Sequence, residues 1–136
     1  MTRAAPILLA LALLAAGCGE REPVRIGFLA GLSGRVADLG EAGRNGAQIA
    51  VDEVNRAGGI GGRRVELIVR DDAQNPEQAI AAVGELVETK VIAVVGPMTS
   101  AMAEVVQPLA NRAGIPFVSP TVTARKFFGV DDQMFL

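Results

Sequence analysis

The sequence predicts an α/β protein in which a doubly wound parallel sheet carries helices on both faces. Segments of strand type and helix type alternate from Val24 to the end of the 136-residue chain, as in repeated strand–helix–strand units. The run Val91–Val95 is apolar at every position, which is typical of a strand buried on both faces of a parallel sheet. A mature chain of this size forms about one small domain.

The first predicted strand is Val24–Ala30, an apolar run that ends in the glycine-containing loop 31–34. The helix that follows is clearest between Asn45 and Asn55. Its apolar residues recur at helical spacing, so one face packs and the other is solvated. They are Ala47, Ala50, Val51 and Val54. The glycines of segment 58–62 end this helix, because glycine adopts the left-handed conformation after a helix without a steric clash.

A second strand is predicted at Val65–Val69. Asn75 and Pro76 mark the start of the next helix, since Asn is a favoured N-cap residue and Pro fits the first helical position. The apolar stripe of this helix comprises Ile80, Val83, Leu86 and Val87. The third strand is the apolar run 91–95.

A third helix is predicted from Ser100 to Arg112. Its apolar side carries Met102, Val105, Val106, Leu109 and Ala113. We expect Pro108 to bend this helix or to make it irregular, because proline cannot donate the helical hydrogen bond. A fourth strand is predicted at Ile115–Val118, and residues 135–136 resemble part of a further strand.

In sheets of this kind, ligands bind beyond the carboxyl ends of the strands. The loops that leave those ends start at Gly31, Asp71, Gly96 and Ser119. We therefore expect these loops to lie along one edge of the molecule and to form the functional site there.

Residues 1–17 are predicted to be an export signal. The uncharged stretch 4–17 falls short of the roughly 20 apolar residues that span a bilayer. Small residues precede Cys18, and this ending resembles a bacterial lipobox, which implies a lipidated Cys18 followed by a short tether through residue 23. The alternative is a buried or reactive free thiol at Cys18, the only cysteine of the chain.

The composition excludes several kinds of active site. The chain has no His, Tyr or Trp, and lipidation consumes its one thiol, so a Ser-His-Asp triad, a Cys-His pair and His-ligated zinc are excluded. Without Arg3 of the signal, 12 basic residues face 15 acidic ones with no block of like charge, so nucleic acid is not an expected partner. No nucleotide-binding glycine motif occurs, and no cofactor is expected.

Asp71 and Asp72 are candidates for a metal site or an acid–base pair. Adjacent strand residues point to opposite faces, however, and Asn75-Pro76 follows closely, so loop and capping roles are favoured and no metal is expected.

Several short segments occur in a characteristic order across residues 24–136. They are Ile26-Gly27 with Gly31-Leu32-Ser33-Gly34; Asn45-Gly46-Ala47 with Ala50-Val51-Asp52-Glu53-Val54-Asn55 and Ala57-Gly58-Gly59-Ile60; Asp71-Asp72; Val94-Val95-Gly96-Pro97 with Thr99-Ser100; and Ala113-Gly114-Ile115-Pro116 with Ser119-Pro120. Each segment alone is weakly specific. The ordered set resembles the type I periplasmic solute-binding proteins of the branched-chain amino-acid and amide transport group.

This resemblance implies two lobes joined by a hinge, with the ligand enclosed between them. Residues 24–136 correspond to an incomplete N-terminal lobe, so we expect a truncated chain. The implied protein is not an enzyme but the substrate-binding lipoprotein of an ABC importer, which captures an amino acid, amide or similar small solute for a membrane permease. It is expected at the periplasmic or other extracytoplasmic face, anchored to the membrane by lipid.

The resemblance also implies the ligand contacts. Ser100, Thr121 and Thr123 are expected to hold the α-carboxylate and α-amino groups of an amino-acid ligand. An anion is favoured at Ser100 because a helix begins there, while Thr121 offers a backbone carbonyl and Thr123 a hydroxyl. The alternative at Thr121 and Thr123 is an ordinary polar loop.

Three further residues complete the expected site. Thr99 precedes Ser100, and for both residues the alternative is a plain helix cap. Leu39 and Met98 are expected to help wall the side-chain pocket. Both are apolar, which favours a ligand with a hydrophobic or small side chain.

Two departures from the family pattern concern the same loops. Arg35 stands where many relatives have proline, and the positions of Gln74 and Thr99, which some relatives join by a disulfide, carry no cysteine. These departures leave the ligand open. Alternative functions are a ligand-sensing receptor module of the same fold, a non-functional fragment, and an exported enzyme, for which no paired catalytic groups are visible.

Overall fold

The structure is a computed structural model that describes residues 21–130 and 132–136. The predicted export signal, Cys18 and the first residues of the tether lie outside the described residues.

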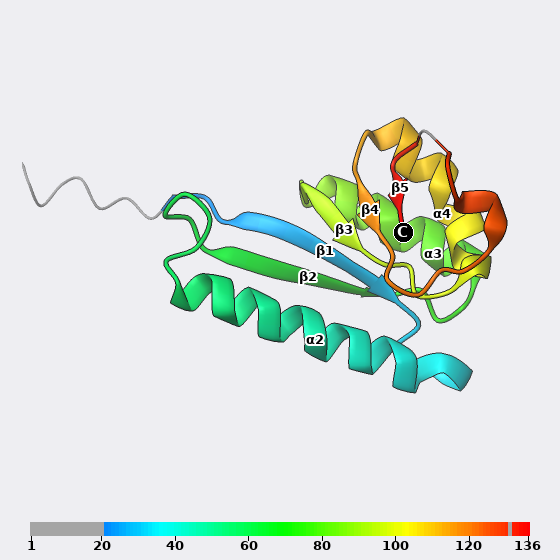
Figure 1. The fold of residues 1–136 in the computed structure, drawn as a ribbon, viewed down its shortest axis with the longest axis horizontal. Helices are drawn as coiled ribbons and strands as arrows, with labels where there is room; N and C mark the ends of the chain where they lie inside the picture. Colours follow the sequence, from blue (N-terminus) through cyan, green and yellow to red (C-terminus); the bar gives the residue numbers. More distant parts are fainter. Residues whose placement is uncertain (1–20, 131) are drawn as a thin grey trace, which may run out of the picture.

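The described chain forms a sheet of five parallel strands in the order β2-β1-β3-β4-β5 (Figure 1). The elements are β1 (Val24–Ala30), η1 (Gly34–Val36), α2 (Ala37–Arg56), β2 (Val65–Asp71), α3 (Pro76–Glu88), β3 (Ala93–Val95), α4 (Ser100–Ala113), β4 (Phe117–Val118), η2 (Arg125–Phe127) and β5 (Met134–Phe135). The strand order reverses between β1 and β3, which makes the sheet doubly wound. The predicted fold class is confirmed.

Helices cover both faces of this sheet, as predicted. On one face α2 packs over β1 and β2, where Val51 joins Val24 and Val65 in one buried cluster. On the other face α3 and α4 pack together against the sheet (Figure 1). Successive β1 side chains alternate between the faces, so Phe28 lies in the cluster with Met98 and Leu29 in the cluster with α3 and α4.

Local sequence explains where α3 and α4 begin and end. The Asn75 side chain accepts a hydrogen bond from the Gln78 amide at 3.0 Å, and Pro76 occupies the first turn. Thr99 accepts from the Met102 amide at 3.4 Å. Gly114 follows α4 with a φ of 65°, the left-handed conformation that glycine adopts without strain.

The first helix is longer than the sequence pattern indicated, because α2 begins at Ala37 rather than near Asn45. Gly40 and Gly43 interrupt the apolar pattern in this first part of the helix. At Gly40 a Cβ atom would lie 2.1 Å from the Gly31 carbonyl oxygen. Close packing of α2 on the loop after β1 therefore requires glycine at position 40. Because glycine has a low helix propensity, the sequence pattern did not indicate a helix there.

Two strand predictions and one helix prediction need correction. β3 contains only Ala93–Val95, and Ile92 is 59% exposed, so the run 91–95 is not buried on both faces throughout. β4 is likewise shorter, at Phe117–Val118. α4 continues through Pro108 without interruption, so the helix is not irregular there, while a bend at Pro108 stays a prediction. Pro108 and Glu104 are both exposed, so water can satisfy the Glu104 carbonyl that lacks an amide donor.

The apolar stripe of α3 is rotated from the predicted one, whereas that of α4 is largely confirmed, since Val105 and Leu109 also pack against the core. The buried residues are Ala79, Ala82, Val83 and Leu86 in α3, and Met102, Ala103, Val106 and Ala110 in α4. Ile80 and Val87 are exposed instead, as is Ala113. The small alanine side chains let both helices approach the sheet closely. A prediction based on the spacing of large apolar residues does not detect these alanine positions.

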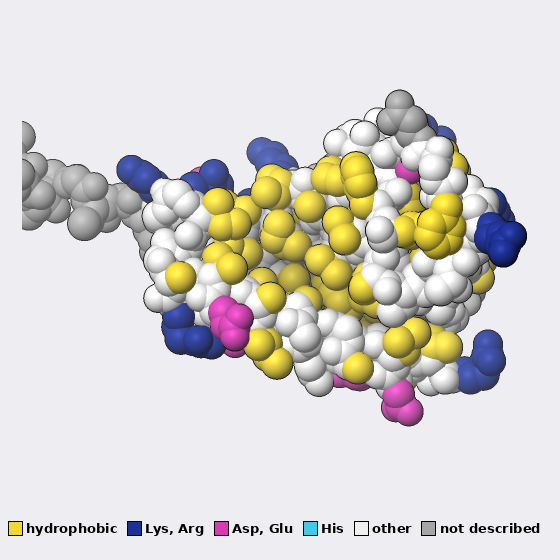
Figure 2. Space-filling view, in the orientation of Figure 1, with side chains coloured by type: hydrophobic (Ala, Val, Ile, Leu, Met, Phe, Trp, Pro, Cys, Tyr) yellow, Lys and Arg dark blue, Asp and Glu magenta, His cyan; other side chains and the backbone are white. Residues whose placement is uncertain are grey.

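The face that carries α2 is only partly covered. A groove of about 210 Å³ runs beside α2 and is lined by Ile26, Ala47, Ala50, Val51, Val54, Ile60, Val65, Leu67 and Val95. Val118 and Phe135 are also 47% and 51% exposed. Figure 2 shows apolar side chains gathered across this middle part of the molecule.

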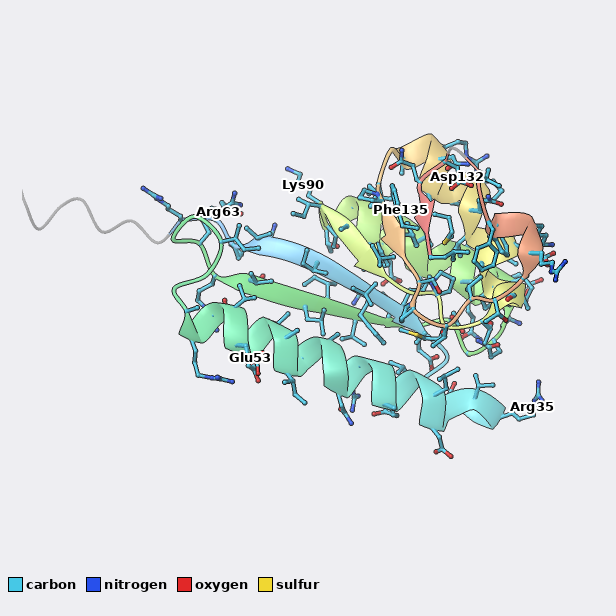
Figure 3. All side chains as sticks on the ribbon, in the orientation of Figure 1. Arg35, Glu53, Arg63, Lys90, Asp132 and Phe135 are labelled. Carbon is cyan, nitrogen blue, oxygen red and sulfur yellow. The ribbon has the colours of Figure 1, made fainter. Side chains whose placement is uncertain are left out.

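The two ends of the strands have different surroundings. Near their start, Arg63 donates hydrogen bonds to the carbonyls of Glu22 at 2.6 Å and Pro23 at 3.1 Å. Figure 3 shows Arg63 there and Arg35 at the opposite end of α2. The loops at that opposite end, 31–36, 72–75, 96–99 and 119–124, are called the carboxyl edge below. Within the described ranges, no helix combines the length and apolar character needed to cross a membrane.

Candidate functional site

Hydrogen bonds join the four loops of the carboxyl edge to one another. The Asp71 carboxylate accepts from the backbone amides of Leu32 at 2.8 Å and Ala73 at 2.7 Å, which ties the loop after β1 to the loop after β2. Partial burial alone raises the pKa of Asp71, but these bonds and further ones from Ser33 outweigh it and hold the pKa below its ordinary value. Asp71 is therefore an ionised structural group.

Asp72 lies in the opposite environment, because its side chain is fully buried. One carboxyl oxygen accepts from the Gln74 amide at 2.8 Å and from the Gln74 side-chain nitrogen at 2.9 Å. The other, Oδ2, is buried with no hydrogen-bond partner. Burial raises the pKa of Asp72 against the opposing effect of the Gln74 hydrogen bonds, and the neighbouring charge of Asp71 raises it further.

The loop after β2 is in turn joined to the loop after β3. The Thr99 hydroxyl donates to the Gln74 side-chain oxygen at 3.0 Å and accepts from the Met102 amide, so Thr99 caps α4. The two positions that carry no cysteine here are thus linked by a hydrogen bond. The capping alternative for Thr99 is confirmed, while a ligand contact of Thr99 stays a prediction.

Ser100 is the first residue of α4 and lies beside the loop after β4. Its Oγ accepts from the backbone amides of Thr123 at 3.4 Å and Ala124 at 3.3 Å. Ser100 is partly buried and Thr123 is exposed. The helix N-terminus, the Ser100 hydroxyl and the Thr123 amide therefore converge on one position at the carboxyl edge.

Two further hydrogen bonds hold the loop after β4 against the loop after β3. Buried Ser119 donates from its hydroxyl to the Pro97 carbonyl at 2.6 Å, and Thr121 donates to the Met98 carbonyl at 2.7 Å. The Thr121 hydroxyl is therefore occupied within the protein. A ligand contact by Thr121 would fall to its backbone carbonyl, the group predicted to accept from the ammonium of a ligand.

The remaining candidates, Met98 and Leu39, differ in their exposure to solvent. Met98 is 3% exposed and packs with Phe28 and Ala30, so its side chain supports the edge from below. Leu39 is 40% exposed on the first turn of α2, at the same end of the molecule. The structure thus brings Met98, Thr99, Ser100, Thr121 and Thr123 together, while Leu39 lies apart from them on α2.

Sequence reasoning named Gln74 but missed its role, which is to bond to residues of the loops after β2 and β3 close to the loop after β1. Ala73 and Gln74 both have positive φ angles, 46° and 54°. This conformation is uncommon for residues other than glycine, and the residue types at these positions do not predict it. The available signals were a long amide side chain after the Asp-Asp pair and the disulfide that some relatives form between the positions of Gln74 and Thr99.

Comparison with known proteins identifies the family. A family model for periplasmic binding proteins matches residues 23–136. The chain belongs to this family. The predicted resemblance to its branched-chain amino-acid group is confirmed by the relatives described next.

Relatives of this periplasmic binding protein are similar over most of its length. The Leu/Ile/Val-binding protein BraC3 of Rhizobium johnstonii is 44% identical over 101 residues, which are 74% of this chain and 28% of the relative. The Leu/Ile/Val-binding protein of Escherichia coli is 29% identical over 115 residues, 85% of this chain and 31% of the relative. The chain therefore spans between a quarter and a third of the length of these relatives.

Solved structures agree with this assignment. The branched-chain amino acid transporter substrate-binding protein LivJ from Streptococcus pneumoniae, in complex with isoleucine, is 38% identical with a TM-score of 0.79, covering 84% of this chain and 33% of that one. An ABC transporter substrate-binding protein from Desulfitobacterium hafniense, in complex with Leu, has a TM-score of 0.73 at 25% identity, with the same two shares covered.

Proposed function

We propose that this chain supplies one wall of the ligand site in an extracytoplasmic substrate-binding protein of an ABC importer, and that the ligand is an aliphatic amino acid. The convergence of the α4 N-terminus, Ser100 and the Thr123 amide carries this proposal. Relatives named as binding leucine, isoleucine and valine, and solved neighbours holding isoleucine or leucine, support the choice of ligand class.

The geometry suits the two charged groups of an amino acid. The Ser100 hydroxyl would donate to the ligand carboxylate, and the carboxylate would also accept from the Thr123 amide in place of the Ser100 Oγ. The positive end of the α4 macrodipole would stabilise the carboxylate charge. The Thr121 carbonyl would accept from the ammonium group. Leu39, exposed on α2, would contact the aliphatic side chain, with Met98 supporting the site from below.

The length of the relatives bears on how such a site would close. The chain spans between a quarter and a third of their length, and small-molecule sites bury most of the ligand surface. We propose that the remaining contacts come from a second lobe, and that the protein delivers its ligand to a membrane permease rather than turning it over.

Localisation is part of the same proposal. Residues 1–17 would direct export, and a lipidated Cys18 would anchor the mature protein at the extracytoplasmic membrane face. Membership of a periplasmic binding protein family supports the location.

The test is a titration of the chain followed by its backbone amide NMR signals. L-leucine is expected to shift the Ser100, Thr123 and Ala124 signals, whereas 3-methylbutylamine, which is leucine without its carboxylate, is expected to leave them in place. Ser100→Ala should weaken leucine binding about tenfold or more, since a hydrogen bond to a charged group contributes about 1.5–3 kcal/mol.

Thr89→Ala is the matched control for this titration. Thr89 also uses its hydroxyl at a helix end, donating to the Glu85 and Leu86 carbonyls at 3.0 Å, but it lies at the other end of the molecule. Equal responses to leucine and to the amine, or equal weakening by both substitutions, would contradict the proposal.

A further inference from the structure

Gln74 lies where three loops of the carboxyl edge meet. Its side-chain nitrogen donates to Asp72 in the loop after β2, and its side-chain oxygen accepts from Thr99 in the loop after β3. In the loop after β1, a Cβ on Gly31 would lie only 3.1 Å from the Gln74 side-chain nitrogen. A single amide group thus bonds to residues of the loops after β2 and β3 and lies close to Gly31 in the loop after β1.

The polarity of these bonds leaves one arrangement. The buried Asp72 oxygen is an acceptor for the Gln74 side-chain nitrogen, which leaves the Gln74 oxygen to accept from the Thr99 hydroxyl. Thr99 has then given its only proton to Gln74, and its oxygen is free to accept from the Met102 amide. Donor and acceptor therefore alternate in one direction from the first turn of α4 to Asp72.

The backbone supports the same placement. Gln74 is held at a positive φ, and Asp72 binds both its backbone amide and its side chain. Asp71 likewise binds the amide of Ala73. An uncommon conformation of this kind persists where surrounding contacts determine it.

We propose that Gln74 is a positioning residue of the ligand site, which through Thr99 fixes the N-terminus of α4, and with it Ser100, relative to the loops after β1 and β2. Only the identification of Ser100 as a ligand contact rests on the proposed function. The placement itself is a property of the chain without ligand.

The experiment compares residual dipolar couplings and amide signals of Gln74→Met with those of the unaltered chain. Met matches the length of Gln without its polar atoms. The couplings of the first turn of α4 should no longer fit the original orientation relative to β1 and β2, and the Ser100, Thr123 and Ala124 signals should shift. Gln78→Met, the same change at an exposed position in α3, is the control and should leave both in place.

Thr99 provides an independent arm if Gln74→Met fails to fold. Thr99→Ser keeps the donating hydroxyl and should retain the original couplings, whereas Thr99→Ala should displace the first turn of α4. Asn75→Ala removes a helix cap in α3 alone and controls for cap loss. Unchanged couplings at Ser100 in folded Gln74→Met, or equal displacement by Thr99→Ser and Thr99→Ala, would overturn the proposal. Since no ligand is present, this result is independent of the leucine titration.

Discussion

Asp71 and Asp72 are neighbours in sequence with opposite electrostatic situations. Asp71 receives several backbone hydrogen bonds and has a lowered pKa, whereas Asp72 is buried, leaves Oδ2 unpartnered and has a raised pKa. For Asp72, the folded state binds its proton more tightly than the unfolded state does. Its contribution to stability is therefore complete below the unfolded pKa near 3.8 and is lost as pH rises through the folded pKa.

Asp72→Asn should consequently stabilise the chain at neutral pH. The Asn side-chain oxygen can accept the two Gln74 hydrogen bonds, and no charge is buried. We expect a gain of about 1 kcal/mol at pH 7, or about 4 °C in melting temperature for a domain of this size. Thermal unfolding followed by circular dichroism from pH 3 to pH 8 measures it, and the gain should shrink toward pH 3.

Asp71→Asn is the control, and its pH dependence should have the opposite sign. A lowered pKa means that the contribution of Asp71 is present above the unfolded value of 3.8 and is lost as pH falls through the folded pKa. This variant should be less stable than the unaltered chain at pH 7 and approach it in acid. The same sign for both variants would contradict the assigned environments.

At the scale of the element, α2 depends on close approach at one glycine and tolerates a side chain at another. A Cβ at Gly40 would lie 2.1 Å from the Gly31 carbonyl oxygen, whereas at Gly46 nothing lies within 4 Å. Gly40→Ala should therefore destabilise the chain by about 1–3 kcal/mol. Gly46→Ala should stabilise it by about 0.5–1 kcal/mol through helix propensity. Urea unfolding of both variants compares them, and equal effects would contradict this packing of α2.

The elements also show how far sequence pattern predicts this fold. Strand and helix order and the Asn75 cap are local features, and residue types alone predicted them. The buried face of α3 was predicted less well than that of α4. Large apolar residues such as Ile80 stay exposed, while alanines fit against the sheet, because packing distance is a tertiary property.

The candidate site was likewise predictable only in part from the sequence. The order of strands and loops predicted one shared edge, and the family resemblance singled out Ser100, Thr121 and Thr123 on it; the structure brings these residues together. The inward-facing Thr121 hydroxyl and the role of Gln74 were not predictable. Both depend on hydrogen bonds between residues that are far apart in the sequence. Thr121 and Met98 are 23 residues apart, and Thr99 and Gln74 are 25 residues apart.

At the scale of the whole molecule, the two faces of the sheet are covered unequally. α3 and α4 cover one face, while the other carries α2 and an apolar strip over β3, β4 and β5 that includes Val118 and Phe135 (Figure 2). Contiguous exposed apolar surface promotes association, and each half-exposed side chain retains part of its hydrophobic driving force.

The 136-residue chain should therefore self-associate through this strip and bind an apolar fluorescent dye. Replacing both exposed residues, Val118→Thr with Phe135→Thr, should reduce dye fluorescence and shift sedimentation toward the monomer, because threonine keeps strand propensity while removing apolar surface. Ile80→Thr changes a residue of similar exposure, 48%, on the opposite face and should leave both readings unchanged. Equal effects of the two changes would show that association is non-specific. A chain that is monomeric and does not bind the dye would show that the exposed apolar strip does not drive self-association.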